Sequence, residues 1–549
     1  MKQFNILLIL LVCCIATSLQ AQQRYFDAQY EVEKTSDVIY ATNISVLTMN
    51  NGDPDTIPLV MDVYTPVGDD NDARPVVLYL HTGSFLPQYF NGQITGGKLD
   101  STVVEACTRL AERGYTAIAP TYRAGWAPTA PDQNIRTATL LQASYRGIQD
   151  IRSCVRFLRQ SADTGGNPYG IAPDKIVAWG QGTGGYISLG MASLDEYEEI
   201  GELDKFINPQ TFEPYVVEAV HGDIDGLQPA FLNLPNTPGY SSDVQLAVNM
   251  GGALGDTSWI DGASSTRPEP PIIGYHVVTD PFAPFGDGPV IVPTTNEFVV
   301  QVHGTRLSVQ VANEKGLNDI VAPAAMDARP LGAVVNARVA GLSPVPIDLS
   351  ALGQSPTTLA TEGMYPFIPP PDANTGAPIR LESGPWDWWS KPLLDVLIPQ
   401  INGLFGTDFN SDTLHFNGLI TNPDMSAEKA RVYMDTIMAH FLPRACLALE
   451  LATVDECLGL VSTEDLIDDS LIELAVAPNP ATDHVWVRTN AAYPMEAIQL
   501  FDINGRFIKA QYNIDNHQYR LERGALPPGT YLIKVKVEDG VSTRKVIFR

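Results

Sequence analysis

The sequence predicts an α/β fold with a mainly parallel sheet and helices on both faces, followed by a small antiparallel β-sandwich. Three observations predict it. Strand-like and helix-like runs alternate between residues 25 and 460, which is typical of a parallel sheet. A glycine-dense turn at residues 180–185 joins a β-branched run to a helix of small residues. Between residues 472 and 549, short alternating runs are broken by turn residues, as in antiparallel sheets.

The length and composition indicate an ordered protein of more than one domain. The chain has 549 residues, of which 44% are apolar and 18% are charged. We expect a main domain at residues 25–460, a polar and acidic linker at 461–471 and the β domain at 472–549. Two long segments, 195–240 and 281–414, are expected to be insertions that form a lid or cap over a site.

The first residues predict export. A charged start precedes an apolar stretch at residues 6–16 that is too short to span a bilayer, and Ala21 is a small residue at a cleavage position. We therefore predict a signal peptide at residues 1–21; the alternative is a buried N-terminal helix. No later run is long and apolar enough to cross a membrane, so no membrane insertion of the mature chain is expected.

The charge and the residue spacing exclude several classes of function. A formal net charge of -28 argues against electrostatic binding of nucleic acid or of an anionic membrane surface. The sequence has no Cys-x-x-Cys pair, which argues against a structural zinc site. We predict neither a metal nor a cofactor.

Removal of the signal peptide leaves four cysteines, and an even number in an exported chain suggests disulfides. Cys446 and Cys457 would close a short loop, and Cys107 and Cys154 would join two helices. We favour this pairing among the three connectivities. Four buried free thiols are the alternative.

The glycine-dense turn has the pattern of a nucleophile elbow. The run Lys175–Trp179 enters Gly180-Gln181-Gly182-Thr183-Gly184, and small residues continue to Met191. In the pattern G-x-S-x-G, the turn lifts the central side chain above the sheet. The central residue here is Gly182, so the attacking oxygen is missing.

A second turn lies upstream, after the strand-like run Arg74–Leu80. It reads His81-Thr82-Gly83-Ser84-Phe85, close to the H-G-G-x-F turn that supplies oxyanion-hole N–H groups. Thr82 stands where the first glycine belongs, which puts the backbone freedom of that position in doubt. We interpret His81 as a structural turn residue.

Between residues 62 and 192 the order of these turns, with a Gly-Tyr turn and a Tyr-Arg pair between them, resembles secreted carboxylesterase- and lipase-like α/β-hydrolases. The resemblance implies that fold. It also implies that the N–H groups of Gly83, Ser84 and Thr183 would form the oxyanion hole, and that Gly182 holds the nucleophile position.

The same family has its triad in the order nucleophile, acid, histidine. The pattern H-x-x-x-D-x-x-x-P from His276 maps the acid to Asp280; a capping or turn role is the alternative. His303, His415 and His440 are the candidates for the base. We predict His415, in a loop before the final helix, although it could be an ordinary surface histidine.

Two functional hypotheses follow. The first is a catalytically degenerate homologue that binds an ester, peptide or glycan-like ligand without cleaving it. The second is an active carboxylic-ester hydrolase that uses a displaced hydroxyl, Thr183 or Ser84, or an activated water. A structural surface protein without a ligand is a third reading. The run Pro385–Trp389 is rich in tryptophan and would either wall a ligand pocket or form core under a long loop.

The last part of the chain resembles the C-terminal sorting domain of the type IX secretion system of Bacteroidetes. Three motifs occur in order: Pro478–Ala481, Leu500–Arg506 and Leu526–Tyr531. The resemblance implies that the type IX machinery is a partner. It also implies export to the cell surface or the medium, with the tail itself often cleaved.

Overall fold

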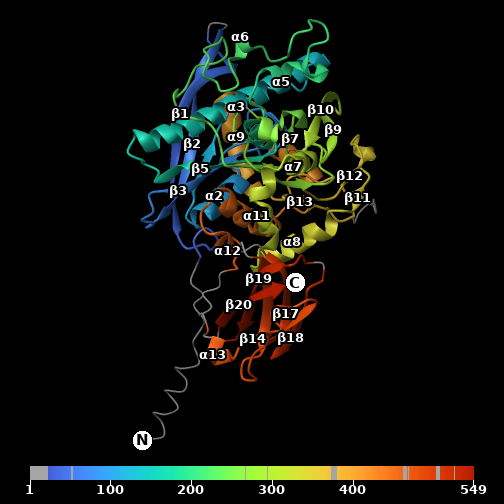
Figure 1. Ribbon diagram of the computed structural model, residues 1–549. Coiled ribbons are helices and arrows are strands. Elements are labelled where there is room, and N and C mark those ends of the chain that lie inside the picture. Colours follow the sequence, from blue (N-terminus) through green and yellow to red (C-terminus); the bar gives the residue numbers. More distant parts are fainter. Residues whose placement is uncertain are drawn as a thin grey trace, which may run out of the picture. The chain divides into compact units, whose positions relative to one another are not determined.

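The computed structural model describes residues 23–50, 53–265, 267–292, 295–371, 380–460, 467, 469–502, 507–524, 526–538 and 540–549. The predicted signal peptide and most of the predicted linker lie outside the described residues. The described chain divides into two compact units, one ending at Leu460 and one that follows it (Figure 1). Each unit is described by itself.

The larger unit is built on an eight-stranded sheet with the order β1-β2-β4-β3-β5-β6-β8-β13. These strands are β1 (Glu31–Asn50), β2 (Asp53–Val67), β3 (Arg74–Leu80), β4 (Thr116–Pro120), β5 (Ile171–Gln181), β6 (Leu246–Met250), β8 (Ile272–Val277) and β13 (Met364–Phe367). β2 pairs antiparallel with β1 and with β4, and all other neighbours are parallel. The mainly parallel α/β sheet is confirmed.

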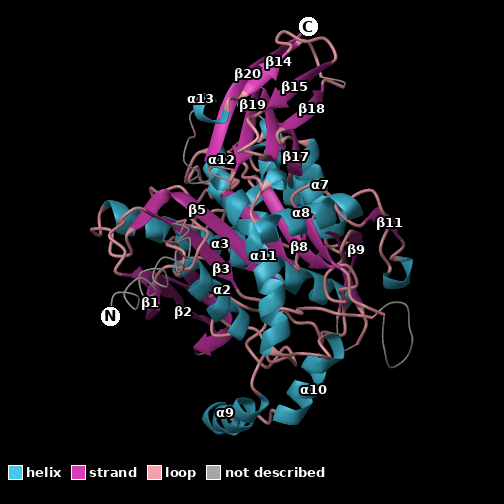
Figure 2. Cartoon of the chain, turned by 90° about the horizontal axis from the view of Figure 1, so that it is seen from below, coloured by secondary structure: helices cyan, strands magenta, loops and turns pink. Residues whose placement is uncertain are grey.

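Helices cover both faces of this sheet (Figure 2). Successive side chains of a strand point to opposite faces, so apolar strands such as β5 supply both layers of core. On β5, Ala178 belongs to the core that α3 (Gln133–Asp163) and α4 (Thr183–Ser193) complete. The next residue, Trp179, points to the other face, where its ring centroid lies 4.5 Å from that of Phe441 in α11 (Ala427–Ala448). A sheet covered in this way needs near-continuous apolar strands, and every residue of β3 is buried.

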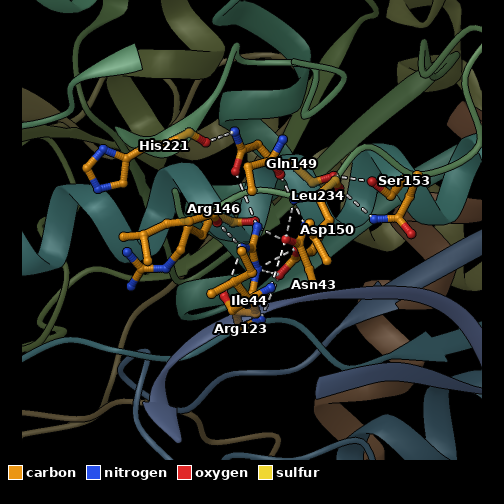
Figure 3. A network of polar contacts seen from close by, with 12 residues as sticks. Asn43, Ile44, Arg123, Arg146, Gln149, Asp150, Ser153, His221 and Leu234 are labelled. Carbon is orange, nitrogen blue, oxygen red and sulfur yellow. Dashed lines mark hydrogen bonds and ion pairs between the residues drawn. The ribbon is translucent and has the colours of Figure 1, made fainter. Parts of the chain in front are cut away.

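The segment 195–240 is fastened to α3 by a buried polar network (Figure 3). Gln149 of α3 donates from Nε2 to the carbonyl oxygens of His221 and Asp223, both at 2.8 Å. Arg123 and Asp150 form a fully buried ion pair at 2.8 Å, and Arg123 also donates to the carbonyl of Leu232. The elements of this segment are α5 (Glu198–Gly201), η1 (Asp204–Phe206) and α6 (Glu218–His221).

The segment 281–414 is more than an insertion, because it contains β13 of the main sheet and α7 (Thr305–Glu314), which packs on β8. Pro366 obscures β13 in the sequence, since proline is tolerated only at the edge of a sheet, and β13 is an edge strand. The rest of the segment consists of β9 (Asp287–Ile291), β10 (Phe298–Gly304), η4 (Leu317–Ile320), η5 (Ala322–Met326), α8 (Pro330–Leu342), β11 (Pro346–Ile347), η6 (Ser350–Leu352), β12 (Thr357–Thr358), α9 (Lys391–Phe405) and the first turn of α10 (Ser411–Thr421).

Five further elements complete the larger unit: α2 (Ser101–Ala111), β7 (Ala253–Leu254), η2 (Thr257–Trp259), η3 (Gly262–Ser264) and α12 (Val454–Cys457). β7, β10 and β9 form a small three-stranded sheet, and β11 pairs with β12. Among the described residues, no helix combines the length and the apolar character needed to cross a membrane.

The smaller unit is the antiparallel β domain that the sequence predicts. Its two sheets have the orders β14-β15-β18 and β17-β16-β19-β20, with antiparallel pairing throughout. The elements are α13 (Asp469–Ile472), β14 (Ala475–Ala477), β15 (His484–Arg488), β16 (Met495–Asp502), β17 (Phe507–Asn516), β18 (Gln518–Glu522), β19 (Gly529–Val537) and β20 (Gly540–Phe548). Apolar side chains of both sheets, among them Val485, Leu500 and Ile533, share one core.

The cysteines pair only in part as expected. Cys446 and Cys457 form a disulfide, whereas Cys107 and Cys154 are free and buried, so the predicted second pair is wrong. The reason lies in β2: Cys154 Sγ is 3.8 Å from the sulfur of Met61, while Cys107 lies near Asp62, the next residue. Successive strand residues face opposite ways, so the two thiols lie on opposite faces of the sheet.

We predict that replacing Cys446 and Cys457 with alanine lowers the free energy of unfolding by about 3 kcal/mol, because the bond closes a short loop in the unfolded chain. Chemical denaturation of the mature chain measures this. Replacing Cys107 and Cys154 with alanine is the control that leaves the bond intact. Peptide mapping under non-reducing conditions should find one disulfide, and a peptide linked through Cys107 and Cys154 would contradict the arrangement.

Candidate functional site

The elbow turn lies where β5 ends and α4 begins. Gly182 is the N-cap of α4, with φ 54° and ψ -117°. Side chains other than glycine adopt such a conformation only at a cost of roughly 1–3 kcal/mol, usually at functional sites. The turn therefore has the backbone conformation of an elbow. Because residue 182 is glycine, this conformation costs little free energy.

Thr82 fills the space above Gly182. A Cβ atom placed on Gly182 would overlap Thr82 Oγ1 and would lie 2.8 Å from Thr82 Cβ. The hydroxyl of Thr82 thus occupies the position from which a serine at residue 182 would project. The sequence shows both substitutions but not that the two residues face each other.

The turn that contains Thr82 has an unusual backbone. Gly83, Ser84 and Phe85 have φ values of 137°, 57° and 50°. Gly83 packs so closely on Gly96 that an added Cβ would lie 2.9 Å from the Gly96 Cα. Within the described residues, no protein acceptor takes the N–H groups of Gly83, Ser84 or Thr183, so these donors are free for a ligand oxygen.

The hydroxyl of Thr183 has no base beside it. Thr183 Oγ1 lies 2.9 Å from Tyr122 OH, which itself donates to the carbonyl of His81 at 2.7 Å. The ring of His81 stacks on Tyr122, and its Nδ1 faces the carbonyl of Thr82 at 2.5 Å. Burial lowers the pKa of His81 to about 4, so the ring is neutral and Nδ1–H donates. His81 holds the turn together.

Asp280 follows β8 and is buried, but its partner is not an imidazole. Its Oδ1 accepts from the N–H of Phe282 at 2.7 Å, and its Oδ2 accepts from Ser383 Oγ at 2.8 Å. Burial raises the pKa of Asp280 to about 7. A Cβ on Gly251 would lie 3.8 Å from Asp280 Oδ2, and Gly252 packs on the carbonyl of Gly182, so these two glycines separate Asp280 from the elbow.

The predicted pairing of His415 with Asp280 is not made. His415 lies in α10 rather than in a loop, and its Nδ1 accepts from Trp389 Nε1 at 2.9 Å. The chain has eight histidines, all of them within the described residues. Their side-chain hydrogen bonds go to residues other than Asp280.

The tryptophan-rich segment contacts the strand that leads into the elbow. Asp387 Oδ1 accepts from Gln181 Nε2 at 2.9 Å and from Thr102 Oγ1 at 2.6 Å, and burial raises the pKa of Asp387 to about 6. Trp386 is buried against Gly251. Trp386 therefore serves as core, and no signal in the sequence points to Ser383 or Asp387.

A pocket of about 470 Å³ is lined in part by His81 and Tyr122. His81 follows β3 and Tyr122 follows β4, so the pocket opens at the carboxyl ends of parallel strands, where α/β proteins bind ligands. Lys98 pairs there with Asp62 at 2.5 Å and with Asp37 at 3.0 Å. The other lining residues are Lys34, Ser36, Leu86, Pro87, Gln88, Gly96, Gly97, Leu99, Thr121 and Ala124.

Within the described residues, one group of carboxylates has the spacing of a cation site. Oxygens of Asp195, Glu199 and Asp261 lie within 4.8 Å of one another. Burial raises the pKa of Glu199 to about 7. The group involves the segment 195–240 and is not part of the elbow.

Two family comparisons match separate parts of the chain. Residues 61–229 match the BD-FAE family, an esterase-like α/β-hydrolase family. Residues 475–549 match the Secretion system C-terminal sorting domain. No curated protein matches the chain.

Solved structures similar to the chain include esterase 2 of Thermogutta terrifontis. The apo form is 17% identical over 47% of this chain and 75% of that chain, with a TM-score of 0.26. The form phosphorylated by paraoxon is 18% identical over 44% and 73%, with a TM-score of 0.26. The propionate-bound form is 18% identical over 47% and 74%, with a TM-score of 0.26.

We predict that Gly182→Ala destabilises the fold by about 2–3 kcal/mol, because the added Cβ strains the backbone and overlaps Thr82. Thr82→Gly in the same chain should recover about half of that loss, since only the overlap is relieved. A double-mutant cycle from urea denaturation gives the coupling. Additive effects would contradict the shared space.

We predict that Asp280→Asn flattens the dependence of stability on pH. The folded chain holds the Asp280 proton up to about pH 7, whereas the unfolded chain releases it near pH 4. The folded state binds more protons in this window, so the wild-type unfolding free energy falls as pH rises from 4 to 7.

Between pH 4 and pH 8, the free energy of unfolding of the variant should rise by about 4 kcal/mol relative to that of the wild type. Urea denaturation at both pH values measures the gain. Asp174→Asn changes an exposed carboxylate and should show no gain. An equal response in both variants would contradict the prediction.

Proposed function

We propose that this chain, an esterase-like α/β-hydrolase with a secretion sorting domain, is a catalytically degenerate homologue that binds a small ester or glycan-like ligand without cleaving it. The sorting domain directs export through the type IX secretion system. The proposed place of action is therefore the cell surface or the medium.

One observation carries the proposal: the side chain of Thr82 occupies the space of the missing nucleophile at Gly182. Loss of the nucleophile from a serine hydrolase lowers turnover about a million-fold, and the oxyanion hole and binding leave only roughly a thousand- to ten-thousand-fold over water. Asp280 adds to the deficit, because its carboxylate holds Ser383 instead of a base.

The features that remain favour binding. The N–H groups of Gly83, Ser84 and Thr183 would receive a carbonyl oxygen of the ligand. The pocket beside His81 has the volume of a small-molecule site, and its paired lysines and aspartates leave little net charge for a charged ligand. A neutral ligand with several polar groups fits this lining best.

A second candidate function, an active ester hydrolase, is favoured by one contact. Ser383 is half-buried, and its hydroxyl donates to a carboxylate whose pKa of about 7 suits a general base. By comparison, the Thr183 hydroxyl bonds to Tyr122 and Ser84 has no base within the described residues. Ser383 is thus a better displaced nucleophile than the two that the sequence suggests.

We predict that the purified mature chain does not hydrolyse p-nitrophenyl acetate or butyrate above background. Gly182→Ser alone should also be inert, because Thr82 blocks the new side chain. The triple variant Thr82→Gly, Gly182→Ser, Ser383→His places a hydroxyl at the elbow and an imidazole beside Asp280. It should exceed background by about a hundredfold, the lower end of what a positioned general base contributes.

The matched control is Thr82→Gly with Gly182→Ser and an unchanged Ser383, which lacks the imidazole and should stay near background. Circular dichroism of each variant checks folding. Wild-type turnover that disappears in Ser383→Ala would support the second candidate. Wild-type turnover that survives Ser383→Ala would contradict both assignments and point to an activated water.

A further inference from the structure

Among the described helices, the neighbouring pair α9 and α10 carries the largest group of exposed apolar side chains. Figure 2 shows both helices standing out from the sheet of the larger unit. We call their exposed apolar side chains, together with the adjacent Phe90, the hairpin face. Its members are Phe90, Leu393, Val396, Leu397, Leu404, Phe405, Phe416 and Ile420, which are 37–76% exposed.

The hairpin face is not the side by which these helices attach to the domain. Leu394, Ile398 and Leu414 are buried against Ile94 in a small separate cluster. On α9, the exposed Leu393, Val396, Leu397 and Leu404 recur at helical spacing, on a different side from the buried pair. A helix that is apolar on several sides is normally covered by protein.

Charge is nearly absent from the hairpin face. The charged residues of α9 and α10 are Lys391, Asp395 and Asp412, all near the first turn of a helix. Lys391 pairs with both aspartates, so the three groups together carry a single net negative charge. In a chain of net charge -28, a patch of this kind has the charge depletion typical of the centre of a protein interface.

The exposed area fits one partner's share of a dimer. A phenylalanine side chain buries about 150–250 Å² when it is covered. The three phenylalanines of the hairpin face are 58–70% exposed, and the five aliphatic side chains roughly double their contribution, so the face presents on the order of 800 Å². A standard interface takes about 800 Å² from each partner. A membrane surface fits less well, since interfacial helices combine an apolar face with lysines and arginines, and the chain as a whole repels anionic lipid.

We propose that the hairpin face binds the same face of a second copy of this chain, in a two-fold symmetric dimer. An isologous contact needs only one self-complementary patch, and an apolar face whose few charges lie near the helix starts meets that condition. The proposal is independent of whether the chain cleaves an ester, because it uses none of the elbow residues.

Sedimentation velocity of the full mature chain, from about 0.5 to 50 µM, tests the proposal. We expect a species of twice the chain mass within this range. Leu404→Glu with Phe416→Glu should raise the dimer Kd by at least about thirtyfold, since each change buries a charge in the interface. Val334→Glu, which alters an equally exposed residue of α8, is the matched control and should leave the Kd unchanged.

Three results would overturn the proposal. The first is a wild-type chain that is still monomeric at 50 µM, and the second is a dimer that the Leu404→Glu, Phe416→Glu double variant leaves intact. The third is a monomer that floats with phosphatidylcholine vesicles and loses this binding in the double variant. The last result would assign the hairpin face to neutral lipid. Thermal melts of the variants confirm that surface substitutions leave the fold intact.

Discussion

The elbow of this protein has room for one side chain, and Thr82 supplies it from the opposite turn. Because Oγ1 of Thr82 stands where a Cβ of residue 182 would be, the two positions constrain each other. A side chain at residue 182 needs a small residue at 82, and a threonine at 82 needs glycine at 182. The shared space keeps the strained backbone of a hydrolase elbow while removing the atom that such a backbone normally presents.

The neighbouring carboxylates fit a site that is packed rather than reactive. Asp100, Asp280 and Asp387 are buried, and burial raises their pKa values to about 8, 7 and 6. Each oxygen-rich side chain is held by hydroxyl, amide or backbone N–H donors. An aspartate held in this way fastens the segments around the elbow to one another, and it has no imidazole to orient.

The sequence predicts the parts of this structure that depend on local pattern. Continuous apolar strands, the glycine-dense turn and the alternating tail indicate the sheet, the elbow and the sandwich, and the structure contains all three. The sequence pattern does not predict contacts between distant segments of the chain. The way in which loops return to the sheet decides three of these contacts: Thr82 with Gly182, Ser383 with Asp280, and His415 with Trp389. The sheet itself separates Cys107 from Cys154. The sequence therefore predicts where the site lies in the fold, but it does not predict which side chains bond to one another there.

The disulfide between Cys446 and Cys457 lies at the end of the larger unit, a few residues before Leu460. It ties the last turn of α11 to α12, so the unit closes with a covalent loop rather than a free helix end. Proteolytic trimming between the units would leave a terminus that cannot fray back into α11. If the sorting domain were removed after export, this bond would still hold the end of the larger unit together.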